Sequence, residues 1–240
     1  MKKTLTVPAA QDIVRIIGPT DLETEQNLLS YYTDPSGGFF SYRAAHGLSR
    51  FAFSHTLPLA QILAGCEGMR NKQGVVCNSE VLSLIWELAK KRSVISSYEL
   101  PIKRLPLRRD LSVKVAPPFA FVEHDKASVF WLQPRKWHAL SVGEMAFLAS
   151  ILKATYLVDD YEGVGFEICD LSAIASLSGK RVPRTYTLDD FDLLPEAEVQ
   201  ERLQRFARAF DALSARGVEQ KKRPGKRPDT GPDLLDGGPQ

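Results

Sequence analysis

The chain has 240 residues, a mass of 26.7 kDa and a formal charge of +2, a size that suits one domain with a small extension. Its three cysteines, Cys66, Cys77 and Cys169, are too few and too scattered for a disulfide framework or a zinc site. No apolar run is long enough to span a membrane or to act as a signal peptide behind the two initial lysines. We therefore expect a cytoplasmic protein with no membrane partner.

Residues 1–77 carry weak helical signals. The segment 21–32, DLETEQNLLSYY, has its acids first and its apolar residues later, as a short helix would. A Pro/Gly turn is expected over 33–38, and a second helix over 54–65, where Pro58 lies in the first turn. The polar stretch 67–74 is typical of a connector. We predict a mostly helical N-terminal extension over 1–77.

Helical and extended patterns alternate more clearly from residue 78 onwards. Apolar side chains recur at helical spacing over 78–92, where Asn78 or Ser79 would cap the helix. An extended arm follows, and its two prolines favour an edge or a break. The runs 119–122 and 128–132 are rich in aromatic and β-branched residues, and the polar EHDKA between them predicts a hairpin.

The second half of the chain continues with a helix, a strand and another helix. Ser141 and Glu144 have the spacing of a capping box at a helix start, and a short strand is expected within 163–172. Asp170 would cap a helix over 171–177. A basic loop and an amphipathic helix from Pro195 to Arg216 are predicted within 178–217, and a disordered tail over 218–240.

The element order over 78–172 resembles the core of the PD-(D/E)XK nuclease superfamily, and more narrowly the N-terminal domain of TnsA-type endonucleases. The residues that carry the resemblance are SEVLSLIWEL, VISSYELP and PPFAFVEHDKASVFWLQPRK. The resemblance implies an α/β protein with a restriction-endonuclease-like core over 78–177, in which a mixed sheet is flanked by helices.

The resemblance also assigns a catalytic site. Glu80 falls on the acid of the family's first helix, Gln133 on the first position of its E/Q-x-K motif and Arg135 on its lysine. These three are the predicted catalytic residues, and Glu80 and Gln133 are the predicted ligands of Mg²⁺ in an active enzyme. Each has a plainer alternative, because the helix dipole favours Glu80 in a first turn and the other two side chains could simply face solvent.

Two departures from the family pattern weaken that site. The family's metal-binding aspartate falls on Pro118, which offers no side-chain oxygen, and arginine cannot deprotonate water as lysine can. A replacement ligand could come from Glu123, His124 or Asp125. These residues lie at the hairpin tip, several residues from Pro118, so their side chains would reach the metal position only with difficulty. We therefore predict a degenerate catalytic centre, with no cofactor if the protein is inactive.

Basic residues cluster in two segments, although 31 basic side chains almost balance 29 acidic ones. The predicted nucleic-acid-binding residues are Lys103, Arg104, Arg108, Arg109, Lys180, Arg181 and Arg184. The alternative is an ordinary solvated surface. Trp131 and Trp137 are expected in the core or on a sheet face, and Cys169 is expected to be a buried thiol.

The function implied by the resemblance is that of a TnsA-like, transposon-encoded subunit acting on DNA ends. Its implied partners are DNA, a transposase subunit and an ATPase regulator. Two alternatives stay open at this point. One is a non-catalytic nucleic-acid-binding adaptor, and the other is a protein–protein scaffold that docks the helix from Pro195 to Arg216 on its partner.

Overall fold

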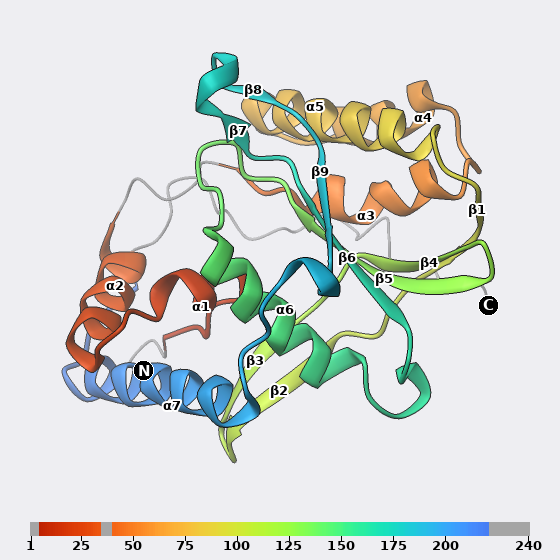
Figure 1. The fold of residues 1–240 in the computed structure, drawn as a ribbon. Helices are drawn as coiled ribbons and strands as arrows, with labels where there is room; N and C mark the ends of the chain where they lie inside the picture. The colour runs from red at the N-terminus through yellow and green to blue at the C-terminus, as the bar shows by residue number, and fades with distance from the viewer. Residues whose placement is uncertain (1–4, 35–39, 221–240) are drawn as a thin grey trace, which may run out of the picture.

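The computed structural model describes residues 5–34 and 40–220, and it contains one mixed five-stranded sheet with helices on both faces (Figure 1). The strand order is β1-β4-β5-β6-β9, in which β5 and β6 are parallel and the other neighbours antiparallel. These strands are β1 Val94–Tyr98, β4 Phe119–Glu123, β5 Lys126–Gln133, β6 Gly165–Asp170 and β9 Arg184–Thr187. The predicted fold class, α/β with a mixed sheet flanked by helices and preceded by N-terminal helices, is confirmed.

Two short strand pairs accompany the main sheet. A separate antiparallel ribbon consists of β2 Lys103–Arg108 and β3 Leu111–Val115, and a small hairpin consists of β7 Ala173–Ile174 and β8 Lys180–Arg181. Pro106 lies within this two-stranded ribbon, which agrees with its expected edge position. The predicted turn over 33–38 falls mainly outside the described residues, as does the predicted tail from residue 221 onwards.

The helices divide between the two faces of the sheet (Figure 1). One face is covered by α3 Arg43–Phe53, α4 Leu59–Glu67 and α5 Lys72–Ala89. The other packs against α1 Ala10–Ile16, α2 Asp21–Thr33, α6 Val142–Tyr156, α7 Glu196–Ala215 and the β2–β3 ribbon. Within the described ranges, none of these helices is long and apolar enough to cross a membrane.

The start of α5 differs from the prediction. The helix begins at Lys72 because the side chain of Asn71 accepts the N–H of Gly74 and caps it. The expected cap, Asn78, is instead fully buried within the helix, where its amide accepts the N–H of Ala45. The predicted connector over 67–74 is therefore shorter than expected: residues 68–71 link α4 to α5, whereas Glu67 ends one helix and residues 72–74 form the first turn of the next.

The predicted hairpin and the helix that follows it are confirmed. His124 and Asp125 both have positive φ and form a two-residue turn between Glu123 and Lys126. Ser141 and Glu144 form the expected capping box at the start of α6.

The helix predicted over 171–177 is wrong. The carboxylate of Asp170 accepts the N–H and the hydroxyl of Ser172, 2.9 and 3.0 Å away, and also pairs with Arg184. These contacts hold the chain extended, so that it enters β7 and a short 3₁₀ turn, Ala175–Leu177, before β8 and β9. The expected basic loop is thus largely strand.

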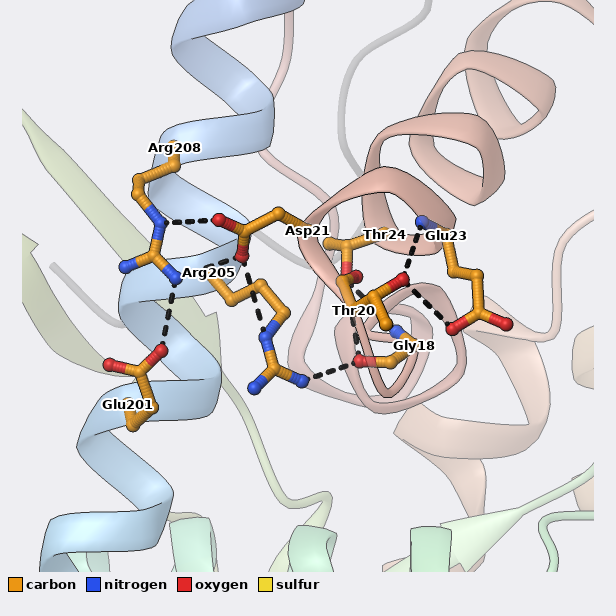
Figure 2. A network of polar contacts seen from close by, with 8 residues as sticks. All are labelled: Gly18, Thr20, Asp21, Glu23, Thr24, Glu201, Arg205 and Arg208. Carbon is orange, nitrogen blue, oxygen red and sulfur yellow. Dashed lines mark hydrogen bonds and ion pairs between the residues drawn. The ribbon is translucent and has the colours of Figure 1, made fainter.

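Helix α7 fastens the N-terminal helices to the rest of the molecule. Asp21 at the start of α2 accepts two hydrogen bonds from Arg208, and Arg205 donates to the carbonyl oxygen of Gly18 at 2.7 Å (Figure 2). The predicted apolar stripe of α7 is confirmed, and its buried residues are Val199, Leu203, Phe206, Phe210 and Leu213. This stripe is covered by the protein's own core, so it is not the docking face that the scaffold alternative assumed.

The core beneath α3 is aromatic. The ring of Phe53 lies 4.8 to 5.3 Å from those of Phe119, Phe121 and Phe130, and all four side chains are buried. Edge-to-face and tilted ring pairs at this spacing add to the stabilisation by apolar burial.

Replacing Phe53 by alanine should lower the free energy of unfolding by about 3 to 5 kcal/mol, because the remaining rings cannot fill the cavity. Urea denaturation measures the change. Leu22→Ala, at a side chain that is 66% exposed, is the control and should change stability by about 0.5 kcal/mol or less. Equal losses in the two variants would contradict this packing.

A partly buried ion cluster joins the end of α5 to the sheet. Arg92 donates to Glu167 at 2.7 and 2.9 Å and to Glu123 at 2.8 and 3.1 Å. Burial opposes ionisation of Glu123, but the hydrogen bonds from Arg92 and from the N–H of Ser93 outweigh it and lower the pKa of this carboxyl.

Because the pKa of Glu123 is lower in the folded protein, its stabilising contribution is present above the unfolded value of about 4.3 and is lost as the pH falls further. Glu123→Gln should therefore cost about 1 to 3 kcal/mol at pH 7. The gap to the unsubstituted protein should shrink below about pH 4. Urea midpoints across pH test this, with the surface variant Glu87→Gln as control. A gap that is constant down to pH 3 would contradict it.

Candidate functional site

The carboxyl ends of the parallel strands β5 and β6 gather several of the predicted site residues. Gln133 ends β5 and is paired in register with Asp170, which ends β6. Both side chains are almost completely buried, at 1% and 2% exposed. In α/β sheets this is the edge at which functional groups commonly collect, so the surroundings of these two residues define the candidate site.

Glu80 reaches this site from α5 and is paired with a buried arginine. Its Oε2 lies 2.9 Å from Nε of Arg181, whose side chain is 1% exposed. Arg181 also donates to the carbonyl oxygens of Pro134 at 2.6 Å and Leu171 at 2.8 Å, and to the hydroxyl of Tyr42 at 3.0 Å. A single guanidinium thus binds the backbone beyond both parallel strands, and Glu80 balances its charge.

Gln133 and Arg135 point to different partners. The amide of Gln133 donates to the carbonyl oxygen of His138 at 2.7 Å, while its buried Oε1 accepts no hydrogen bond from any described residue. Arg135 pairs with Asp12 on α1 at 2.5 Å. Pro118 lies just before β4, the strand that pairs with β5. The structure therefore brings Glu80 and Gln133 to the same sheet edge, with Arg135 turned towards α1.

This donor set does not fit a divalent cation. The one carboxylate that the sequence placed there, Glu80, is already neutralised by Arg181, and Gln133 offers one amide oxygen. Glu123, one of the three suggested replacements, is bound by Arg92 at the other end of β4. Among the residues that the structure describes, no group of three His, Cys, Asp or Glu side chains is arranged to hold a metal. A catalytic role for Glu80, Gln133 and Arg135 stays a prediction, whereas their structural contacts are clear.

Hydrogen bonds to alternate carbonyl oxygens hold the segment that follows β5, residues 134–138, here called the 134–138 loop. Pro134 accepts from Arg181, Lys136 from the N–H of Ala173 at 2.7 Å, and His138 from Gln133 and from Arg15 at 2.6 Å. Burial, and then the charge of Arg135, lowers the pKa of Arg15 to about 10, so its guanidinium still carries its charge at neutral pH. The buried polar groups of the site therefore fix the course of this loop.

The loop presents Trp137 to solvent. The side chain is 70% exposed, and its ring lies against Gly179 in the turn between β7 and β8, where a β-carbon would come within 2.6 Å of the ring. The ammonium of Lys136 lies 5.2 Å from the ring centroid. Leu177 and Val182, on the same hairpin as Gly179, are 46% and 38% exposed.

The expectation that Trp137 lies in the core or on a sheet face is wrong, although Trp131 is buried as expected. The sequence does contain a signal, because Gln133-Pro134 ends the strand before Trp137 and Ser141 starts a helix after it. A tryptophan between those two points belongs to a connection. Cys169 is buried as expected, and burial raises the pKa of its thiol, which keeps it protonated and unreactive.

The predicted nucleic-acid-binding residues do not form one surface. β8 and the β2–β3 ribbon lie at opposite ends of the molecule (Figure 1). Four of the seven have internal partners: Arg181 with Glu80, Arg184 with Asp170, Arg108 with Asp110 and Asp211, and Lys103 with the rings of Tyr156 and Tyr161. Arg104, Arg109 and Lys180 are exposed, with no carboxylate partner in residues 5–34 and 40–220.

The comparison with protein families gives a match to the sliding clamp-binding bacterial toxin SocB over residues 45–214, which is more than half of the chain. The chain belongs to the SocB family. A comparison with curated proteins finds no match. In this SocB-family chain the 134–138 loop, the β7–β8 hairpin and the buried cluster around Arg181 lie almost entirely within the matched residues.

Membership in the SocB family corrects the resemblance to TnsA-type endonucleases, which is wrong. The transposition function is wrong with it, as are the implied partners, namely DNA, a transposase subunit and an ATPase regulator. The resemblance rested on an element order that the structure does contain, but one arrangement of helices and strands supports many functions. Of the two alternatives, the protein–protein role agrees better with the family's description.

Arg181→Ala should lower the free energy of unfolding by about 3 kcal/mol, since two buried carbonyl oxygens and the Glu80 carboxylate lose their donor. Arg181→Lys should recover little of this, because one ammonium cannot reach all four acceptors. Chemical denaturation measures both, with the exposed neighbour Lys180→Ala as control. Full stability of Arg181→Lys would contradict the described geometry.

Proposed function

We propose that this protein is a bacterial toxin that binds the sliding clamp by direct protein–protein contact. The observation that carries the proposal is the family match over residues 45–214. A protein with this partner works in the cytoplasm, and we place the chain there.

The geometry of the candidate site is consistent with a binding protein. The buried polar groups at the ends of β5 and β6 are bonded to backbone carbonyl oxygens and to one another, so they serve to shape a loop. The loop and the adjacent hairpin expose three large apolar side chains, Trp137, Leu177 and Val182, and the largest of them is the tryptophan. Exposed aromatic side chains on a fixed scaffold are typical of protein interfaces.

The proposal predicts a direct complex between two purified proteins. In isothermal titration calorimetry, the full chain should bind the sliding clamp with a dissociation constant of about 1 μM or tighter, as expected for an interface of ordinary size. Binding should need no nucleic acid and should persist after nuclease treatment of both samples. The absence of heat and of complex formation at about 100 μM would contradict the proposed function.

A further inference from the structure

We propose that Trp137 is the apolar anchor by which this chain docks on the sliding clamp, and that Arg181, Gln133 and Arg15 hold it in its docking position. This inference rests on the proposed function and names the surface that carries it out. The Trp137 surface, as we use the term, consists of Trp137, Leu177 and Val182 with the flanking Lys136 and Lys180.

The first argument is the exposure of a large apolar ring. An indole side chain that is 70% exposed leaves apolar area in water that burial against a partner would remove. Leu177 and Val182 are also exposed, on the hairpin whose Gly179 touches the ring. Tryptophan is among the residues most enriched at the points of an interface where truncation costs most affinity.

The second argument is that the ring is already positioned. The carbonyl oxygens on both sides of Trp137, those of Lys136 and His138, are each bound by a donor from a different part of the fold. Arg181 binds the carbonyl of Pro134 at the base of the loop. A loop whose backbone is held in this way loses little conformational freedom on binding, which is the condition under which the side chain that it carries contributes most affinity.

The ring of Trp137 packs against Gly179. Its φ is +70°, and a β-carbon there would lie 2.6 Å from the outer edge of the Trp137 ring. Any other residue would be strained in this backbone conformation and would displace the ring. Contact with the backbone of the hairpin thus supports the outer edge of the tryptophan ring, while most of the side chain remains accessible.

The charges around the ring indicate the chemistry of the partner surface. Lys136 lies over the ring and Lys180 is exposed beside Gly179. Arg181 is engaged in internal hydrogen bonds and does not face a partner. The surface therefore fits an apolar hollow with carboxylates at its rim, and we assign that hollow to the clamp. Nucleic-acid binding uses more cations than the two lysines beside this indole, so the surface fits a phosphate backbone poorly.

Another exposed apolar site, on β1, fits docking less well. Ile95 and Tyr98 are 68% and 56% exposed on this edge strand. The register shifts between Val94 and Ser96, so Ile95 lies in a bulge of the kind that protects edge strands from pairing with other chains. This leaves Tyr98 as a suitable exposed aromatic residue for a control variant.

The test is a set of calorimetric titrations of the sliding clamp with full-length variants. Trp137→Ala should raise the dissociation constant at least about tenfold, and Trp137→Phe, which keeps a smaller ring, should fall between alanine and the unsubstituted protein. Gly179→Ala should also weaken binding although it keeps the tryptophan in the sequence, because the added β-carbon would displace the ring. Tyr98→Ala should bind like the unsubstituted protein. Thermal unfolding of each variant verifies that the fold is intact.

The outcomes separate this inference from the proposed function. If the unsubstituted protein binds the clamp and Trp137→Ala binds equally well, the anchor is overturned and the proposed function stands. If the unsubstituted protein does not bind, the proposed function itself fails. Sedimentation of the chain alone should show a monomer, and a dimer that Trp137→Ala dissolves would assign the surface to a second copy. Binding of duplex DNA that depends on Trp137 would likewise overturn the assignment to the clamp.

Discussion

The arrangement at the carboxyl ends of β5 and β6 depends on the burial of one guanidinium group. Arg181 comes from β8, yet its hydrogen bonds reach the chain just beyond β5, the chain just beyond β6, the helix α5 and the hydroxyl of Tyr42. A buried charge is costly to desolvate, so the site is stable only because every one of these acceptors lies within reach. The same contacts fix the 134–138 loop and thus the position of Trp137.

The fold class could be predicted from the sequence because its signals are local. Alternating apolar residues, the EHDKA turn and the Ser141–Glu144 capping box each specify one element from a few neighbouring residues. The errors arose where a long-range contact overrides a local preference. Asp170 has the character of a helix cap, but its pairing with Arg184 and Ser172 holds the chain extended. Asn78 has the same character, but it is a buried link to α3.

The candidate site shows why its function could not be read from residue types. The family resemblance predicts Glu80 and Gln133 as metal ligands at one sheet edge, and the structure does place both residues at that edge. Their partners are far away in sequence: Arg181 is 101 residues from Glu80. The carboxylate lies beside a buried arginine, and the amide is bound to a carbonyl oxygen. Both groups stabilise the structure through contacts that no local sequence pattern predicts. Trp137, which is expected in the core or on a sheet face, is instead exposed on the loop that the same contacts hold.

The central claim is that Trp137 becomes buried when the chain meets the sliding clamp, and side-chain footprinting with hydroxyl radicals tests it most directly. Oxidation of individual side chains is measured by mass spectrometry in the free protein and in the complex, with Tyr98 as an internal reference on β1. We predict that the oxidation rate of Trp137 falls several-fold in the complex while that of Tyr98 is unchanged. An unchanged rate at Trp137 in a saturated complex would contradict the account.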